Sequence, residues 1–371
     1  MPPLEAWEKV ILNQESFFET LHERYGCITC HGGVSGTDDK EAAHANLVTD
    51  PPSAEACADC HPDQAATDAQ SLHTNLAGYL TVLTARSAPD KMEQISVMMD
   101  NQCEDCHSSC GQCHVSRPAN VGGGLLVGHN FKKLPPMNLT CTGCHGSRIQ
   151  DEYKGKNEGV RGDVHWIKGG MPCFDCHTQD EMHGALGEYD HRYDGPRTPS
   201  CSETGLGKEC HADMPLAPEI EQHDQTHLDA LSCQACHSTT YKNCFNCHVA
   251  QQDGVAFFKI DPSVMDFRIG LNPIQGPDRP WKYVPLRHVP IARDSFEYYG
   301  EDLLPNFDAL PTWKYATPHN IQRNTPQTET CDACHGNPGF FLTAGDVLPD
   351  ELEANKDVIV REVPEPVEEG R

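Results

Sequence analysis

Residues 103–114 constrain the chain more than any other stretch. They hold two copies of the pattern Cys-x-x-Cys-His, Cys-Glu-Asp-Cys-His at 103–107 and Cys-Gly-Gln-Cys-His at 110–114, with two residues between them. In this pattern the two thiols can add across the two vinyl groups of one porphyrin, and the histidine can bind its iron from the proximal side. Because so short a unit stays close to its haem, the spacing predicts two haems almost in contact.

The same pattern recurs along the chain and uses nearly all of its cysteines. It occurs nine times, and the two cysteines left over form Cys201-x8-Cys210-His211, which we interpret as a tenth site with a longer loop. The predicted cofactor is therefore ten covalent haem c groups. The attachment cysteines are Cys27, Cys30, Cys57, Cys60, Cys103, Cys106, Cys110, Cys113, Cys141, Cys144, Cys173, Cys176, Cys201, Cys210, Cys233, Cys236, Cys244, Cys247, Cys331 and Cys334. The proximal histidines are His31, His61, His107, His114, His145, His177, His211, His237, His248 and His335.

Two other chemistries compete for these cysteines. A structural zinc site combines two Cys-x-x-Cys halves, but it does not need a histidine after every second cysteine. Cys201 and Cys210 could instead form a disulfide beside His211. The regular motifs favour haem, and the stretched pair stays open between haem and a disulfide.

The supply of histidine matches the predicted number of haems. Of 21 histidines, eleven are not proximal, and ten haems with two histidine ligands each need ten distal ligands. We expect nine or ten of the eleven to bind iron. His223 lies four residues before His227, so one of that pair could instead serve as a support or face solvent. The candidates are His22, His44, His73, His129, His165, His183, His191, His223, His227, His288 and His319.

Composition indicates what kind of fold to expect. Only 37% of the 371 residues are hydrophobic and 7% are aromatic, while 30 Gly and 28 Pro disfavour long regular elements. The haems would supply the missing apolar mass. We therefore predict mostly irregular coil with short α-helices and little β-structure, a haem-packed core and an elongated haem chain.

The chain divides into two regions by its motifs. Residues 1–248 carry nine haem motifs, counting the stretched one, and apolar periodicity predicts an N-terminal helix over 4–24. Two more helices are expected in 64–100, separated by Pro89.

Residues 249–371 hold the last motif, many aromatic and proline residues, and an acidic tail. We interpret them as a segment that wraps haem faces and delivers His288 and His319. The apolar run 358–360 could form an edge strand that pairs with a neighbouring subunit, or it could belong to a disordered tail.

Charge and chemistry narrow the compartment and the partners. The formal charge is −27, which argues against nucleic acid and leaves metals or cationic proteins as partners for acidic surfaces. Haem is attached to such chains outside the cytoplasmic membrane, and no apolar run is long enough to cross a bilayer. The first residues, Met-Pro-Pro-Leu-Glu-Ala-Trp-Glu, do not form a signal peptide, so we expect a leader outside this numbering and a periplasmic or extracellular protein.

The motifs over residues 27–335 resemble those of multihaem c-type cytochromes, in particular decahaem electron conduits and extracellular cytochrome filaments. This resemblance implies electron transfer without bond chemistry, because two histidines per iron leave no vacant site. Its partners would be other redox proteins, copies of itself, or extracellular minerals and metals. The chain is also similar to octahaem enzymes, some of which have stretched motifs, and this alternative implies an oxidoreductase acting on a nitrogen or sulfur oxyanion at one open haem. The oxidoreductase hypothesis requires that at least two candidate histidines are not ligands.

Overall fold

The computed structural model describes residues 4–49, 53–102, 109–117, 122–126, 128–157, 159–185, 193–194, 199–201, 210–211, 219–239, 248–258 and 266–365. The chain forms two compact units, which are described separately. Unit 1 comprises residues 1–80, 99–144 and 177–198, and unit 2 comprises residues 81–98, 145–176 and 199–371. Helices α7 (Ala77–Arg86) and α8 (Met92–Gln102) contain residues of both units.

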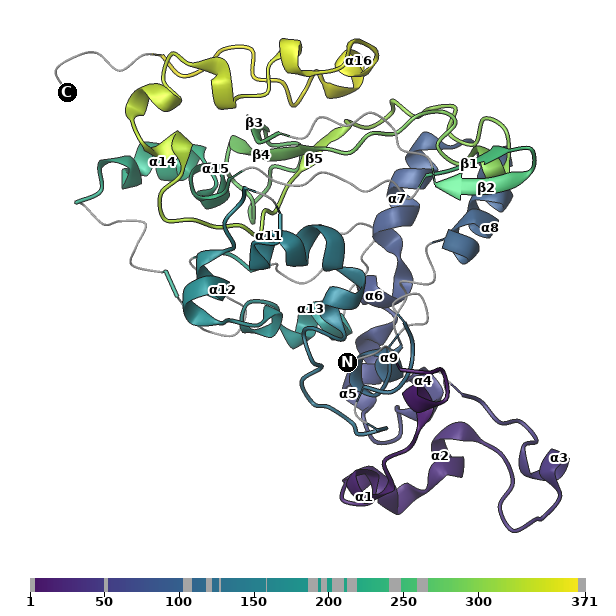
Figure 1. Ribbon diagram of the computed structural model, residues 1–371. Coiled ribbons are helices and arrows are strands. Elements are labelled where there is room, and N and C mark those ends of the chain that lie inside the picture. The colour runs from purple at the N-terminus through teal and green to yellow at the C-terminus, as the bar shows by residue number, and fades with distance from the viewer. Residues whose placement is uncertain are drawn as a thin grey trace. The chain divides into compact units, whose positions relative to one another are not determined.

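Unit 1 consists of short helices joined by irregular segments (Figure 1). Its α-helices are α1 (Gln14–Phe17), α2 (Cys27–His31), α3 (Lys40–Ala43), α4 (Ser53–Ala56), α5 (Pro62–Asp68), α6 (Leu72–Asn75), α9 (Cys110–His114), α10 (Cys141–Cys144) and α13 (Gln179–His183). Two 3-10 helices precede α2, η1 (Glu8–Val10) and η2 (Leu21–Tyr25).

Unit 2 holds the β-strands as well as further short helices. Its α-helices are α11 (Asp151–Lys154), α12 (Val164–Gly169), α14 (Gln225–Ala230), α15 (Cys233–His237) and α16 (Leu352–Asn355), and a π-helical turn spans Gly146–Gln150. Its strands are β1 (Val249–Gln252), β2 (Val255–Phe258), β3 (Arg268–Leu271), β4 (Tyr283–His288) and β5 (Trp313–Tyr315). Its 3-10 helices are η3 (Pro89–Lys91), η7 (Cys173–Asp175), η8 (Glu221–His223), η9 (Glu297–Tyr299), η10 (Pro326–Thr328), η11 (Cys331–Ala333), η12 (Pro338–Phe340), η13 (Ala344–Asp346) and η14 (Pro349–Glu351).

These elements confirm the predicted fold class of short helices, irregular coil and little β-structure. Among the described residues no α-helix is longer than the eleven residues of α8. Pro89 separates α7 from α8 as expected, because proline lacks the N–H that a helix interior requires. No helix in the described part of the chain is long and apolar enough to cross a membrane.

The N-terminal segment differs from its prediction. Instead of one helix over 4–24 it forms η1, α1 and η2, with extended or turn residues between them. Phe17 is buried, whereas Trp7, Val10 and Leu21 are each more than 60% exposed. The apolar periodicity therefore marks a surface that unit 1 leaves open, and no single helix buries it.

The core of unit 2 is a three-stranded antiparallel sheet in the order β3-β4-β5. Ile269, Val284, Leu286 and Trp313 are almost completely buried on it. Because this sheet lies inside the segment 249–330, that segment supplies a side-chain core of its own as well as aromatic cover. β1 and β2 form a separate hairpin, and all four residues of β2 are exposed.

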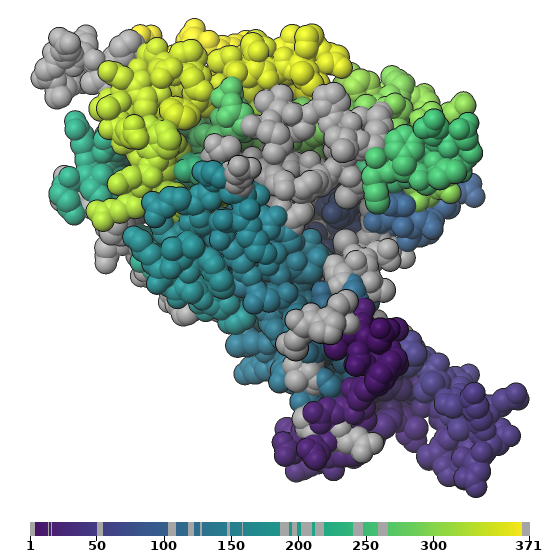
Figure 2. All heavy atoms as spheres, in the orientation of Figure 1, coloured from purple at the N-terminus to yellow at the C-terminus, as the bar shows by residue number. Residues whose placement is uncertain are grey.

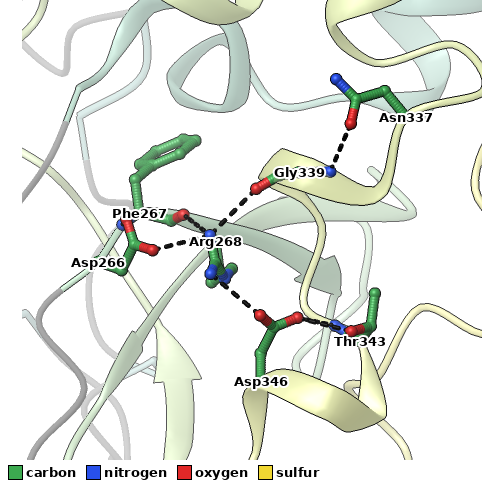
Figure 3. A network of polar contacts seen from close by, with 7 residues as sticks. All are labelled: Asp266, Phe267, Arg268, Asn337, Gly339, Thr343 and Asp346. Carbon is green, nitrogen blue, oxygen red and sulfur yellow. Dashed lines mark hydrogen bonds and ion pairs between the residues drawn. The ribbon is translucent and has the colours of Figure 1, made fainter.

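Arg268 ties β3 to the segment that follows the last haem motif (Figure 3). Its guanidinium donates to the carbonyl of Gly339 at 3.1 Å and to Oδ1 of Asp346 at 3.0 Å, and it pairs with Asp266 at 2.9 Å. Asp346 in turn accepts hydrogen bonds from N and Oγ1 of Thr343. These contacts fix the loop after His335 on the sheet, which helps to position that motif.

The C-terminal segment up to residue 365 packs on the same core. The amide of Leu271 donates to the carbonyl of Val358 at 2.9 Å, and the amide of Val360 donates to the carbonyl of Leu342 at 2.8 Å. Val358, Ile359 and Val360 are buried, and Figure 2 shows the segment (yellow) as a continuous part of the surface of unit 2. The run thus binds within its own chain, so it does not remain a free edge for a neighbouring subunit.

Candidate haem-binding sites

The Cys-x-x-Cys-His motifs in the described part of the chain fold as single helical turns. Helices α2, α9 and α15 each consist of one complete motif. In the other motifs the amide of His61 donates to the carbonyl of Cys57 at 2.8 Å, and that of His335 to Cys331 at 2.9 Å. Since residues three and four apart lie on one side of a helical turn, both thiols and the imidazole face the same way. One porphyrin can therefore meet all three groups.

Six proximal histidines each lie opposite a histidine that the sequence nominated as a distal ligand. The ring centres are 5.8–6.4 Å apart in all six pairs. In unit 1 the pairs are His61 with His22, His31 with His129, and His114 with His183. In unit 2 they are His211 with His165, His237 with His223, and His335 with His227.

These separations fit an iron held between two imidazoles. A histidine nitrogen binds a first-row metal at about 2.0–2.1 Å and the ring centre lies about 1.1 Å behind it, so two histidines on opposite sides of one ion have centres about 6.2 Å apart. Direct stacking of two rings would bring them closer, as with His22 and Phe131 at 3.7 Å. The spacing between the histidines therefore corresponds to that of a bis-histidine metal site.

Backbone carbonyls orient four of the proximal rings. Nδ1 of His31 lies 2.8 Å from the carbonyl of Val48, and the same contact joins His114 to Lys132, His237 to Gln322 and His335 to Glu365. A ring that donates Nδ1–H to a carbonyl presents a neutral Nε2 to a metal. The sequence could not show these partners, because any residue supplies a carbonyl.

Three rings have a carboxylate at Nδ1 instead. Asp163 lies 2.8 Å from His165, Asp224 lies 3.0 Å from His227, and Glu181 lies 3.3 Å from His177. Sequence reasoning missed all three acids. The available signal was an Asp two or three residues before a histidine at a helix start, where it also caps the helix.

Burial sets the protonation of several rings. It is the largest cause that lowers the pKa of His22, His129, His183 and His237, and of His73, where the nearby His177 adds to it. Neutral imidazole is the form that binds a metal. The pKa of His165 moves the other way, because its hydrogen bond to Asp163 raises it.

The stretched motif takes part in the same pattern. His211 faces His165 at 6.0 Å between ring centres, the separation seen at the regular motifs. Cys201 is an unpaired thiol within hydrogen-bonding distance of Cys233, and Cys210 is also a free thiol. His211 thus shares the ring separation of the regular motifs, and the tenth haem stays a prediction.

Thiols of different motifs lie side by side at two places. Cys57 is within hydrogen-bonding distance of Cys110, and Cys201 is within that distance of Cys233. Neither neighbour relation follows from the sequence, which pointed to 103 with 110 and to 233 with 244. Residues 103–108 and 240–247 lie outside the described part, so those two expected pairs of haems stay predictions.

The remaining described candidates include His73, which lies close enough to His177 for that ring to add to the lowering of its pKa by burial. His44 is exposed at the end of α3, with Nδ1 2.8 Å from the carbonyl of Lys40. His288 is fully buried with Nε2 against Glu351, and the amide of His319 donates to Glu152. Among the proximal residues, His248 packs edge-on against Phe296. Cys103, Cys106, His107, His191, Cys244 and Cys247 lie outside the described residues.

The zinc alternative finds no site in the structure. Within the described ranges no group of three or more His, Cys, Asp or Glu side chains is placed to hold a metal ion. A tetrahedral zinc site needs four such ligands together.

Comparison with known proteins supports the same class. Residues 56–146 match the family model described as "Cytochrome c554 and c-prime", a stretch that contains the motifs beginning at Cys57, Cys103, Cys110 and Cys141. No curated protein and no solved structure matches the chain. The match supports a multihaem c-type cytochrome, with covalent haem c as cofactor and electron transfer as function.

Proposed function

We propose that the chain transfers electrons through ten covalently bound bis-histidine haems, in the periplasm or outside the cell. The observation that carries this proposal is the set of six facing histidine pairs, whose ring centres are 5.8–6.4 Å apart. Two ligands on each iron leave no position for a substrate, so electron transfer without bond chemistry is the function that these pairs support.

The chain's own residues fix where each cofactor would sit. Thiols of the helical-turn motifs would tether it, and the proximal ring and a ring from a distant segment would bind its iron. Bound haem iron supplies one-electron oxidation and reduction. Carbonyls such as those of Val48 and Gln322 hold the proximal rings in one orientation, which keeps the ligand set rigid during that exchange.

The number of candidate distal histidines can be matched to the number of predicted haems. His288 uses Nε2, the atom that faces the metal in such sites, for Glu351. With His288 assigned to the core, ten distal candidates remain for ten haems, among them His44, His191 and His319.

The test is intact mass combined with electron paramagnetic resonance of the oxidised protein. Ten haems and low-spin signals alone are the expected result. A mass with nine haems and a Cys201–Cys210 disulfide would remove the tenth site. A high-spin signal equal to one iron, with cyanide binding, would favour the alternative of an oxidoreductase acting on a nitrogen or sulfur oxyanion.

The placement of thiols supports a continuous row of cofactors. The neighbour relations Cys57–Cys110 and Cys201–Cys233 put motifs that are far apart in sequence next to each other within each unit. Close packing of this kind is useful for electron exchange over distance. Partners would then be other redox proteins, copies of the chain, or minerals and metals that approach the end of the row.

The exposed N-terminal region is the surface that we propose for assembly into a filament. Trp7, Val10 and Leu21 leave apolar area open on unit 1, and His44 is exposed with its Nδ1 already engaged. No histidine in the described part of the chain faces His44, so its Nε2 is available to an iron of a neighbouring copy.

Replacing His44 with alanine tests this assembly. We expect shorter particles by electron microscopy and one new high-spin iron per copy, with the same number of haems by intact mass. Glu41→Ala on the same helix is the matched control and should assemble normally. If H44A particles have normal length and only low-spin iron, the neighbouring-copy role is wrong.

A further inference from the structure

Asp163 occupies an unusual position among the acids of unit 2. It is only 2% exposed, and both of its carboxylate oxygens are engaged. Oδ1 accepts from the amide of His165 and from its Nδ1, both at 2.8 Å, while Oδ2 accepts from the amide of Ile321 at 2.8 Å. The carboxylate is thus locked between the start of α12 and the segment 319–323.

Among the described residues, the two other acids at the Nδ1 of a histidine ring are either more exposed than Asp163 or farther from the ring. Asp224, which faces His227, has a side chain that is 50% exposed. Glu181 lies farther from its ring, at 3.3 Å, and its second oxygen accepts from the amide of Thr178. Asp163 therefore combines a short contact to the Nδ1 of a candidate iron ligand with burial. Another buried acid, Glu351, contacts Nε2 of His288, so it occupies the atom that would bind a metal.

A buried carboxylate at Nδ1 changes what the ring does at Nε2. It pulls on the Nδ1 proton, so the imidazole becomes a stronger electron donor toward iron. Its negative charge also favours the more positive, oxidised iron, and in a water-poor interior this attraction is weakly screened. Both effects lower a reduction potential, and a neutral backbone carbonyl exerts them only weakly.

We propose that Asp163 is a positioning residue that orients His165 and lowers the reduction potential of the haem held by Cys201, Cys210 and His211. The tenth site would then titrate in the low-potential part of the row. This inference rests on the proposed function, because it needs a haem between His165 and His211.

The location of the site gives the shift a consequence. The thiol of Cys201 lies within hydrogen-bonding distance of the thiol of Cys233, and Cys176 is close enough to interact with it electrostatically. A low-potential cofactor held by this motif would therefore lie close to cofactors held by the motifs at Cys173 and Cys233. Asp163 would thereby set the reduction potential of a haem that has neighbouring haems within unit 2.

The test compares Asp163→Asn with the wild type in a redox titration followed by absorbance, with intact mass measured on each sample. Asparagine keeps an oxygen that can cap α12 and accept from His165, but it removes the charge. We expect ten haems in both proteins, and one tenth of the absorbance amplitude moving from low to higher potential in the variant. Asp224→Asn is the matched control, and its solvent-exposed carboxylate should give a smaller shift.

Two outcomes would overturn the inference while leaving the proposed function intact: ten haems with unchanged potentials in D163N, or equal shifts in D163N and D224N. A wild-type mass with nine haems would instead count against the tenth site itself. If D163N does not fold, the redox titration of a variant with both Cys201 and Cys210 replaced by alanine still tests the inference. The amplitude that it loses must come from the low-potential end of the titration, and loss at the high-potential end would contradict the role of Asp163.

Discussion

Nε2 of His288 lies 2.9 Å from Oε2 of Glu351, 63 residues further along the chain, in the core of unit 2. The histidine belongs to β4 and is fully buried, and the same carboxylate oxygen accepts from Oγ1 of Thr312 at 2.9 Å. Asn355 extends this network, because its Nδ2 donates to Thr312 and its Oδ1 accepts from the amide of Trp313. The network joins the sheet to the C-terminal segment.

Replacing His288 with glutamine tests whether the residue is structural. We expect the number of haems by intact mass and the low-spin signals to stay as in the wild type, since no iron loses a ligand. The free energy of unfolding should fall by about 1–3 kcal/mol, because Glu351 would keep at best a weaker partner in a buried site. Loss of a low-spin signal in this variant would show that His288 binds iron.

His129→Ala gives the opposite expectation for a ring in a facing pair. It removes the partner of His31, whose ring centre lies 5.8 Å away. One iron should become high-spin and bind cyanide, while the haem stays attached through Cys27 and Cys30. H288Q serves as the control histidine variant. A fully low-spin H129A protein would mean that another residue is the ligand opposite His31.

The motifs allowed much of the candidate site to be predicted from sequence. Each half-site is local, since Cys27 to His31 is one helical turn. The distal candidates were the histidines that remain outside the motifs, and each of the six facing pairs contains one of them. Which ring meets which could not be predicted, because His22 with His61 and His227 with His335 depend on long-range folding.

The limits of the sequence argument follow from periodicity and burial. Apolar spacing over 4–24 predicted one helix, but Trp7 and Leu21 find no surface in unit 1 to pack on. The strands β3 and β4 are four and six residues long and interrupted by Gly270 and Pro285, so they carry no alternating pattern to read. The contact between His288 and Glu351 could not be predicted either, because the acid lies far along the chain.

Gly270 gives a prediction about packing in the unit 2 sheet. A Cβ at this position would meet Cδ1 of Leu286 and would lie 2.7 Å from the carbonyl oxygen of Val358. We expect Gly270→Ala to lower the stability of unit 2 by about 1–3 kcal/mol, since the sheet must shift to admit a methyl group. Thermal unfolding of the variant measures the loss.

Gly276→Ala is the matched control for this change. A Cβ there meets nothing within 4 Å, and the backbone needs no left-handed conformation. Its free energy of unfolding should stay within about 0.5 kcal/mol of the wild-type value, as for most surface substitutions. Equal effects of the two alanines would contradict the close approach of β3 to β4 and residue 358.

Arg86 supplies the last prediction, because it anchors α7 to a loop of the same unit. Its side chain is buried, Nε donates to the carbonyl of Phe307 at 2.9 Å, and Nη2 donates to those of Leu310 and Pro311 at 3.2 and 3.3 Å. Burial lowers the pKa of Arg86 to about 10, so the guanidinium is still charged at pH 7 and keeps its donors.

Arg86→Met should cost about 1–3 kcal/mol, because carbonyls that accept from a charged group lose their donor inside the fold. Hydrogen exchange should rise first in residues 303–311. The control is Arg293→Met, which removes an exposed ion pair with Asp302 at 2.8 Å and should cost less than about 1 kcal/mol. If the two variants exchange alike in 303–311, the guanidinium contacts do not hold the loop. The attachment must then come from the remaining contacts, such as the amide of Asn306 donating to the carbonyl of Arg86 at 2.9 Å and Oγ of Ser87 donating to the carbonyl of Leu303 at 2.8 Å.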